Sequence, residues 1–333
     1  MGFSKDLLNN IRANASADYQ ARIPEATRTN FLEIGMAFSE YTPLYNEFSA
    51  ALINKIGKST IESKLFKNKL AKFKSGSILT QQDVEEIFID MAKGANAYDP
   101  DGKNPLGRRT DDNVKVVYHR MNRQDEYCIS LGDIDFIRVF RSEATLDTFI
   151  TGKLNAVYSR AAHDEWLHMK NLLASYDGYF NYGVPTIADS DAATTAKTFV
   201  KTLRKATLDL SFMSTAYNKQ GVYQQSEEGS LVLFVNKDVL AEVDVEVLAK
   251  AFNLGKTDIP VEVIPMDDFG TLTDTYGLLV DKDFFKVFDT LSRMEPQRNA
   301  QGLFTNYFYH VHQILSVSPF KNAIRFTTAT VSA

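Results

Sequence analysis

The sequence predicts an α+β protein in which long helices and long strands share one chain. Three observations carry this prediction: a helical pattern from Ser142 to Gly178, an alternation of helices and strands between 193 and 280, and an aromatic-rich strand from Phe304 to Ser318. The chain has 333 residues, of which 44% are hydrophobic and 24% are charged. A chain of this kind buries a large core and is expected to form about two domains.

The segment from Ser142 to Gly178 is predicted to be one long helix that serves as a spine. At about 1.5 Å per residue it is about 50 Å long, which is close to the diameter of a compact chain of this size. Ser142 can cap the first turn, and Gly178 is placed to end the helix in a left-handed conformation. Gly152 weakens the helix by about 1 kcal/mol and is the main risk of a break. Apolar residues recur at helical spacing: Leu146, Phe149, Ile150, Leu154, Val157, Ala161, Ala162, Trp166, Met169, Leu173 and Tyr176.

The segments before the spine differ in character. Residues 1–41 contain one short amphipathic turn followed by polar sequence, which predicts an N-terminal arm without a core of its own. Thr42 and Pro43 are a helix-start signal for a helix that closes at Gly57. Residues 60–78 fit a helix in one part and a strand in another, so their structure stays open.

Residues 77–117 predict a long hairpin. Two apolar pieces, around 87–89 and 114–118, flank a tip from Pro100 to Arg109 that carries almost no apolar side chains. Such an excursion costs chain entropy and gains little from a core of its own, so a functional role or a stabilising partner is expected. Strand material follows at 126–140 and leads into the spine.

The segment after the spine predicts an inserted α/β subdomain. A loop from Gly178 to Asp191 comes first, and helices then alternate with strands. The expected elements are a basic helix at 193–208, a strand at 231–235, a helix at 239–252, and strands at 261–264 and 276–280. The aromatic-rich segment at 304–318 then predicts one long strand that returns to the spine.

Charge and composition limit the classes of function. The net charge of −5 means that the surface as a whole is not attracted to phosphate. No apolar run of 18 residues and no signal-peptide pattern is present, so a cytoplasmic chain without membrane contact is expected. The single cysteine, Cys128, excludes an internal disulfide and is expected to be a buried thiol.

One stretch is locally basic. Between 55 and 74 the only acidic residue is Glu62. This run fits either a solvated face or a contact for an acidic partner surface or nucleic acid. Its basic residues are Lys55, Lys58, Lys64, Lys67, Lys69, Lys72 and Lys74.

Two segments resemble part of a phosphate-binding loop, but they lack the glycine spacing that this motif requires. Gly57-Lys58-Ser59 and Gly255-Lys256-Thr257 would each need a further glycine five residues before the first glycine. Leu52 and Lys250 occupy those positions. No phosphate-binding motif is therefore assigned.

The histidines give no convincing metal site. His163 and His168 are five residues apart, about 140° around a helix of 3.6 residues per turn, which is poor geometry for one ion. His310 and His312 share a strand face, but their segment of the sequence contains no nearby acidic or further His ligands, and His119 has no evident partner. These patterns predict no cofactor and favour an assembly protein over an enzyme. A metal-dependent enzyme that uses the histidines stays open as an alternative.

Three stretches resemble the major capsid proteins of small short-tailed phages of the phi-twenty-nine kind, which have the HK-ninety-seven-type capsid fold. They are VEEIFIDMAK (84–93), VLAKAFNLGKTD (247–258) and LLVDKDFFKVFDTLSRMEPQRNAQGLFTNYFYHVHQILSVSPFKNA (278–323). The stretch VKVVYHRMNRQDEY (114–127) is a weaker fourth. The resemblance covers most of the chain between about 45 and 325, and the order of predicted elements matches the fold as well.

This resemblance implies four structural parts. They are an N-terminal arm (1–41), a peripheral domain (42–76, 118–180 and 301–333) with the spine helix at 143–177, an extended loop (77–117) and an axial domain (181–300). In such shells the axial domains cluster at the five- and six-fold centres. The extended loop lies over the peripheral domain of the neighbouring subunit.

The function implied by the resemblance is that of a non-enzymatic major capsid protein. Such a protein self-assembles into the pentamers and hexamers of an icosahedral or elongated shell that encloses double-stranded DNA. The implied partners are further copies of the chain, a scaffolding protein, a portal and non-specifically held DNA, without a membrane. The implied location is the virion, and the host cytoplasm during assembly. An encapsulin-like compartment of the same fold is the alternative.

The residues expected to contact other subunits lie in the hairpin tip and in the basic run. In the tip, a contact with the adjacent subunit is expected, and in the run, charge complementarity. The candidates are Lys103, Asn104, Arg108 and Arg109 in the tip, and Lys64, Lys67, Lys69, Lys72 and Lys74 in the run.

Overall fold

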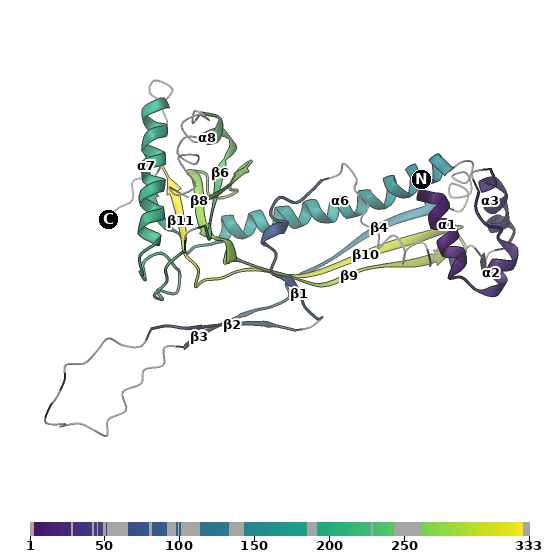
Figure 1. Ribbon diagram of the computed structural model, residues 1–333, viewed down its shortest axis with the longest axis horizontal. Coiled ribbons are helices and arrows are strands. Elements are labelled where there is room, and N and C mark those ends of the chain that lie inside the picture. Colours follow the sequence, from purple (N-terminus) through teal and green to yellow (C-terminus); the bar gives the residue numbers. More distant parts are fainter. Residues whose placement is uncertain are drawn as a thin grey trace.

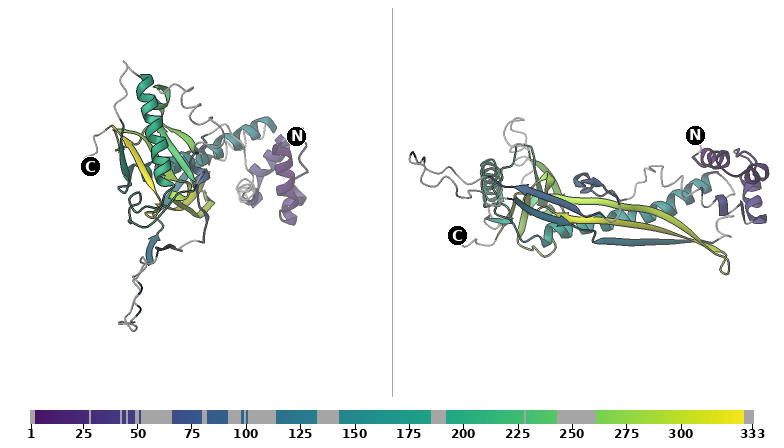
Figure 2. Two further views of the ribbon diagram at one scale, coloured as in Figure 1. Left: turned by 60° about the vertical axis from the view of Figure 1, so that its left-hand side comes forward. Right: turned by 90° about the horizontal axis from the view of Figure 1, so that it is seen from below.

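Helix α6, Glu143–Ser175, runs along most of an elongated molecule (Figure 1). The computed structural model describes residues 3–27, 29–41, 43–44, 46–48, 51, 66–79, 82–91, 98, 100, 114–132, 143–184, 192–227, 229–242 and 261–328. At one end of α6 lies a five-stranded sheet, and at the other end lies a group of short N-terminal helices (Figures 1 and 2). The spine predicted from the sequence is therefore confirmed.

The helix α6 runs unbroken through Gly152. Its described buried face includes Val157, Ala161, Met169 and Leu173, all on the predicted stripe. The predicted left-handed end at Gly178 is wrong, because the helix already ends at Ser175 and Gly178 is not among the glycines with positive φ. Gly178 is needed for close packing instead: a Cβ there would lie 2.6 Å from the Lys219 Cβ and 2.6 Å from the Tyr176 hydroxyl oxygen.

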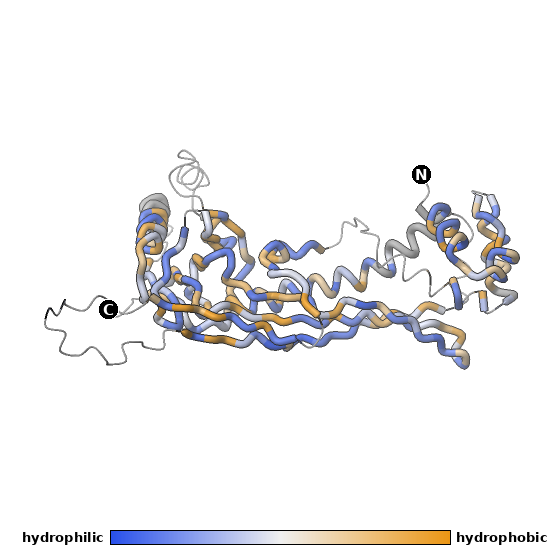
Figure 3. Tube along the Cα trace, turned by 60° about the horizontal axis from the view of Figure 1, so that its bottom comes forward, coloured by the Kyte–Doolittle hydropathy of each residue, from blue (hydrophilic) through white to orange (hydrophobic). Residues whose placement is uncertain are grey.

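A four-stranded sheet lies along α6. Its order is β1-β9-β10-β4, and β1 is the one strand that pairs in parallel. The bounds are β1 Gly76–Ser77, β9 Phe285–Asn299, β10 Phe304–Val317 and β4 Arg123–Gly132. Burial alternates along β4, as expected for a strand with one covered face, and Figure 3 shows hydrophobic and hydrophilic positions mixed along the long strands.

The strand β10 confirms the predicted returning strand, whereas β9 was not predicted. Its sequence carries charges and Pro296 within the strand, and these obscure a period of two. The predicted strand at 126–140 is β4 as far as Gly132, and residues 133–140 lie outside the described residues.

The five-stranded sheet contains the strands predicted at 231–235, 261–264 and 276–280. Its order is β5-β11-β8-β6-β7, with bounds Phe180–Gly183, Ala323–Thr327, Thr275–Asp281, Leu231–Asn236 and Glu262–Met266. Helix α7, Ala192–Leu210, covers one face, and the C-terminal half of α6 packs on the other. The side chains of β6 alternate between these two cores, since Leu233 faces α7 and Phe234 faces α6. Helix α8, Lys237–Glu242, is the described part of the helix predicted at 239–252.

The sheets divide the chain differently from the predicted boundary at 300/301. Strand β9 was placed with the axial domain, yet it pairs with β10 in the four-stranded sheet. Strand β11 was placed with the peripheral domain, yet it pairs with β8 in the five-stranded sheet. After β8 the chain crosses between the sheets twice, at the short helix η3, Lys282–Phe284, and at 318–322. A boundary drawn at one point of the sequence cannot represent this double crossing.

The predicted hairpin is present as a two-stranded ribbon. Strand β2, Val84–Ile89, pairs antiparallel with β3, Val114–His119, in a register that sets Ile87 opposite Val116. The ribbon leaves the molecule near the crossing between the two sheets (Figure 1). The predicted tip lies almost wholly outside the described residues.

The N-terminal segment has a core, which corrects the prediction of an arm without one. Helices α1 (Phe3–Ala13), α2 (Ala17–Arg22) and α3 (Phe31–Glu40) bury one shared cluster. Its members are Leu7, Leu8, Ile11, Tyr19, Ile23, Ala26, Phe31, Ile34, Phe38, Leu44 and Phe48. Each helix alone is too short to show a strong pattern, and the apolar residues meet only when the three helices pack together.

Two further expectations concern the segment that follows. Of the helix predicted from Thr42 to Gly57, the described positions 43–44, 46–48 and 51 are helical, and the rest lies outside the described residues. In the undecided segment at 60–78, the described part forms a short 3-10 helix, Ala71–Phe73, followed by β1.

Candidate assembly surfaces

The hairpin β2–β3 has an inner face that is fixed to the body of its own chain. The ring of Phe88 stacks on Phe320, with centroids 5.3 Å apart. The Lys115 ammonium donates a hydrogen bond to the backbone oxygen of Gln220 over 2.5 Å. The Tyr223 amide donates to the Asp90 carboxylate over 3.2 Å, just beyond β2. These contacts hold the ribbon against the loops beside the five-stranded sheet.

His119 is the buried end of this inner face. Its Nδ1 lies 2.7 Å from the Ser316 hydroxyl of β10, and its Nε2 lies 3.1 Å from the Glu86 carboxylate of β2. Sequence reasoning found no partner for His119, and this is corrected: the partners lie 33 and 197 positions away in the chain, beyond the reach of any local pattern.

Glu86 gathers several donors at the same place. The Ser318 hydroxyl donates to it over 2.8 Å, and the Lys286 ammonium lies 3.4 Å away. Burial alone would raise the pKa of Glu86, but the hydrogen bond from His119 and the charge of Lys286 outweigh burial and lower that pKa. The ionised carboxylate therefore joins the hairpin to the crossing between the sheets.

The opposite face of the hairpin, here called the hairpin outer face, is exposed and largely apolar, and its one carboxylate, Glu85, accepts a hydrogen bond from the Tyr118 hydroxyl over 3.1 Å. Five large side chains on alternate positions point away from the body, and each is between 41% and 71% exposed. They are Ile87, Ile89, Val114, Val116 and Tyr118. A contiguous exposed apolar patch of this kind is typical of an interaction site. The alternation was visible in the sequence, but the side that faces solvent depends on the tertiary anchors.

The predicted contact residues of the hairpin tip, Lys103, Asn104, Arg108 and Arg109, lie outside the described residues. Lys64, in the basic run, does as well. Their roles in contacts between subunits stay predictions.

The described lysines of the basic run differ in their exposure and in their ion-pair partners. Lys67 and Lys69 are exposed. Lys72 forms an ion pair with Glu262 of β7. Lys74 is largely buried, and its ammonium lies 2.9 Å from Glu165 and 2.7 Å from Asp289. Lys74 therefore has partners within its own chain, whereas Lys67 and Lys69 present their charges to solvent.

The contacts of Lys74 belong to a polar network beneath the spine. Burial would lower the pKa of Lys74, but the two carboxylates raise it. Gln313 of β10 donates to both Glu165 and Asp289 over 2.6 Å, and its oxygen accepts from Arg123 over 2.6 Å. This network joins α6, β9, β10 and β4, so it fixes the spine on its sheet.

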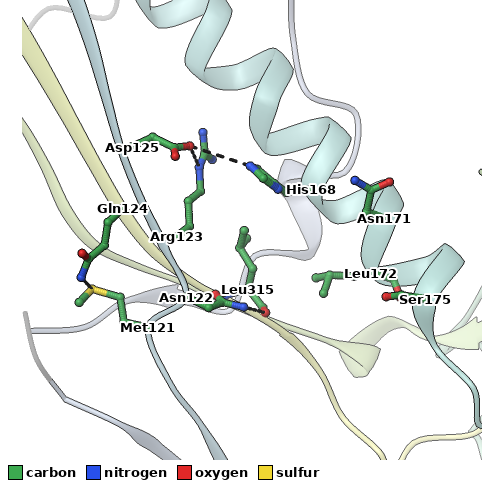
Figure 4. A pocket seen from close by; sticks show the side chains of 10 residues that line it. All are labelled: Met121, Asn122, Arg123, Gln124, Asp125, His168, Asn171, Leu172, Ser175 and Leu315. Carbon is green, nitrogen blue, oxygen red and sulfur yellow. Dashed lines mark hydrogen bonds and ion pairs between the residues drawn. The ribbon is translucent and has the colours of Figure 1, made fainter.

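A polar groove of about 610 Å³ opens between α6 and the start of β4 (Figure 4). His168 points toward Asp125, with Nε2 3.9 Å from the carboxylate. The Arg123 guanidinium is engaged by Asp125, Gln313, Tyr127 and the backbone of α6. The Ser175 hydroxyl donates to a backbone oxygen of its own helix instead of to a base. The groove therefore shows no arrangement for nucleophilic catalysis.

The remaining histidines and the cysteine have structural surroundings. His163 packs edge-on against Phe66, and His310 lies 3.8 Å from Glu126 on the neighbouring strand. Within the described part of the chain, no three His, Cys, Asp or Glu side chains are grouped so as to hold a metal ion. Cys128 is exposed, contrary to the prediction of a buried thiol, because β4 is an edge strand and Cys128 lies on the sheet face away from α6.

No helix among the described residues is both long and apolar enough to cross a membrane. Exposed surfaces of the described residues include the hairpin outer face, Lys67 and Lys69, and apolar side chains on the N-terminal helices and at the end of α7. Surfaces of this kind suit association between proteins.

Solved structures share this fold. A chain in the capsid structure of Staphylococcus phage Andhra matches 82% of this chain and 87% of its own length, with a TM-score of 0.65 and 12% identity. A chain in the structure of native bacteriophage P68 matches with a TM-score of 0.63, 13% identity and the same coverage. The fold is therefore the HK-ninety-seven-type fold of phage capsid proteins.

Sequence relatives identify the family of capsid proteins to which the chain is related. The major capsid protein of Bacillus phage B103 is 36% identical over 329 residues, which cover 98% of this chain and 73% of the relative. The major capsid protein of Bacillus phage PZA is 34% identical over 336 residues, with 99% and 74% coverage. The family model of the Phi29-like phage major capsid protein matches residues 8–327. This chain belongs to that family.

Proposed function

We propose that this chain is the repeating subunit of a phage head shell, in which pentamers and hexamers enclose double-stranded DNA. The observation that carries the proposal is the family match over residues 8–327, together with a hairpin that projects from the body and turns an apolar face outward. The relatives are named as major capsid proteins, which supports a structural role and not a catalytic one.

Each part of the chain would have its own position in the shell. The five-stranded sheet with α7 forms the axial domain at the five- and six-fold centres, and the four-stranded sheet with α6 forms the peripheral domain. The extended hairpin lies over the peripheral domain of the next subunit. Arg108 and Arg109 of the tip, and the exposed Lys67 and Lys69, are the charged residues proposed to contact neighbouring copies.

The further partners follow from the same role. A scaffolding protein would guide assembly in the host cytoplasm, a portal would occupy one vertex, and DNA would be held without sequence preference. The net charge of −5 supports a wall that holds DNA only loosely. An encapsulin-like compartment would instead hold protein cargo, and the named sequence relatives, which are phage proteins, do not favour it.

Negative-stain electron microscopy of the full chain, expressed alone and beside light scattering of the same sample, tests the proposal. Closed shells or sheets of hexamers are expected. If the chain alone stays small, co-expression with the scaffolding protein of its phage should produce them. A uniform monomer or dimer under both conditions would contradict the proposal, and the nucleic acid content of purified particles separates a DNA-filled head from a cargo compartment.

A further inference from the structure

The base of the hairpin is attached to the four-stranded sheet of its own chain. The ring of His119 lies 2.7 Å from the Ser316 hydroxyl of β10, and the Glu86 carboxylate lies 3.4 Å from the Lys286 ammonium of β9. Strands β9 and β10 pair with each other in that sheet. The first contacts of the inner face are therefore made with the half of the molecule that contains the long strands.

The next part of the ribbon lies on one of the two crossings between the sheets. The Ser318 hydroxyl donates to Glu86 over 2.8 Å, and the ring of Phe88 stacks on Phe320. Ser318 and Phe320 belong to the segment 318–322, which leads from β10 to β11. The ribbon thus continues from the four-stranded sheet onto the connection to the other sheet.

The outer part of the described ribbon reaches the loop at 211–226, beside the five-stranded sheet. The Lys115 ammonium donates to the backbone oxygen of Gln220, and the Asp90 carboxylate accepts from the Tyr223 amide. This loop is bound to the five-stranded sheet, because the Ala323 amide of β11 donates over 2.8 Å to a backbone oxygen within it. The same face of one ribbon is therefore attached to both sheets.

The hairpin and α6 lie on opposite sides of the long strands at this point. Leu315 and Val287 belong to the apolar core beneath α6. Their neighbours Ser316 and Lys286 point the other way, toward the hairpin, because side chains alternate along a strand. Figure 1 shows α6 and the hairpin on the two sides of β9 and β10. The apolar core joins the two sheets on one side, and the hairpin joins them on the other.

We propose that the hairpin is a strap that fixes the angle between the two sheets of its own chain. The crossings, η3 and 318–322, are short segments between long strands, and changes of angle between packed parts are absorbed at such places. A bend there moves the loop at 211–226 relative to β9 and β10. Because the ribbon is attached on both sides of the bend, the bend must break either the contacts of Lys115 and Asp90 or those of His119.

A hairpin that is merely anchored would need only its base. At the base both ring nitrogens of His119 have partners, and the ionised Glu86 gathers three donors. The contacts of Lys115 and Asp90 add a second attachment, and they reach the other sheet. By linkage, any change in the position of the ribbon then shifts the angle between the sheets, and any change in that angle shifts the ribbon.

The angle matters for a shell. In the proposed assembly each copy contacts its neighbours through the parts that contain both sheets, so the angle between the sheets sets the curvature of the wall. This consequence rests on the proposed function. The strap itself rests only on contacts within one chain, so it is tested on the unassembled protein.

A distance measurement between the two sheets tests the strap. The full chain carries one nitroxide label on the natural Cys128, which is exposed on β4, and a second on Lys201→Cys, at an exposed position of α7. Double electron–electron resonance is recorded at a protein concentration below that of assembly. The labelled chain should show one narrow distance distribution. Adding Asp90→Ala with Lys115→Met should broaden the distribution and shift its maximum.

The matched control changes the hairpin without touching the strap contacts. Glu85→Ala with Tyr118→Phe removes the 3.1 Å hydrogen bond between these two side chains, which lies within the hairpin outer face. The control should keep the narrow distribution. Circular dichroism should show the same fold for all three labelled proteins.

The outcomes separate the strap from the proposed function. An unchanged distribution in the Asp90→Ala, Lys115→Met variant overturns the strap, and so does equal broadening in the control or a distribution that is already as broad in the natural chain. A chain that forms no particles, alone or with its scaffolding protein, overturns the function and leaves the strap standing. Electron microscopy of particles from the strap variant should show a loss of uniform size. Particles of the natural size from a chain with broadened distances would overturn the link to curvature alone.

Discussion

The amide of Gln313 in β10 donates a 2.6 Å hydrogen bond to the carboxylate of Glu165 in α6, across 148 positions of sequence. Both side chains are buried, and the same amide group also serves Asp289 while its oxygen accepts from Arg123. The Gln313 side chain thus forms hydrogen bonds with charged groups from three other elements. The spine is held on its sheet by this specific polar contact as well as by apolar packing.

Replacing Gln313 with Ala should destabilise the fold by about 2 kcal/mol, because Glu165 and Arg123 would be left buried with one partner fewer. Urea unfolding followed by circular dichroism measures the change. Gln124→Ala is the matched control, since Gln124 is exposed on neighbouring β4, and it should change the free energy of unfolding by less than about 0.5 kcal/mol. Equal effects of the two substitutions would contradict the role of the network.

The stability of the chain should fall in acid, and Glu165 should carry part of that dependence. Burial would raise the pKa of Glu165, but Lys74, Gln313 and Asn68 together hold it below its ordinary value of 4.5. As the pH falls below 4.5, the unfolded chain binds the proton before the folded chain does, so this contribution to stability is lost. Above that pH the contribution is fully present.

The variant Glu165→Gln should therefore be less stable at neutral pH and should show a smaller loss of stability on acidification than the natural chain. Unfolding curves at neutral and acidic pH give both quantities. Glu126→Gln, a change at an exposed carboxylate on β4, should follow the natural chain. An unchanged acid dependence in Glu165→Gln would show that other groups account for it.

The long elements were predictable because their patterns are long. The helix α6 and the strand β10 each repeat their apolar period over many residues, and α7, β6, β7 and β8 follow the expected alternation. Strand β9 carries Pro296 and several charges, which hide its period. Each N-terminal helix is too short for its apolar pattern to predict a core, because the core forms only when all three helices pack together.

The candidate surfaces were predictable only in outline. The hairpin itself follows from its apolar flanks, but its outward face is set by contacts of Phe88 and His119 with residues far away in the sequence. Lys74 was grouped with exposed lysines because its partners are also far away in the sequence: its ammonium forms ion pairs with Glu165 and Asp289. The exposure of Cys128 depends on strand order, which no local pattern contains.

Two glycines should respond in opposite directions to Ala. A Cβ at Gly277 in β8 would lie 2.9 Å from the backbone oxygen of Phe234 in the neighbouring strand, whereas a Cβ at Gly152 in α6 meets nothing within 4 Å. Gly277→Ala should therefore cost about 1–3 kcal/mol through overpacking. Gly152→Ala should stabilise the helix by about 0.5–1 kcal/mol. Thermal unfolding of both variants checks the signs, and a stabilising Gly277→Ala would mean that the two strands can separate without loss.

Reversing the charge of the hairpin tip should block assembly without unfolding the chain. Arg108 and Arg109 are adjacent, and Arg108→Glu with Arg109→Glu replaces two positive charges by two negative ones at a site proposed to meet a neighbouring copy. Like charges opposed across an interface are strongly unfavourable. Closed shells should be absent by electron microscopy, while circular dichroism and the unfolding temperature stay those of the natural chain.

The charge-preserving pair Arg108→Lys with Arg109→Lys is the matched control for this reversal. It keeps both positive charges and removes only the planar guanidinium groups, so shells should still form if charge is what the neighbour recognises. Loss of shells in both pairs would instead indicate bidentate recognition of carboxylates by arginine. Normal shells from the Glu pair would show that the tip arginines make no essential contact, and the search for charged contacts would then move to Lys67 and Lys69.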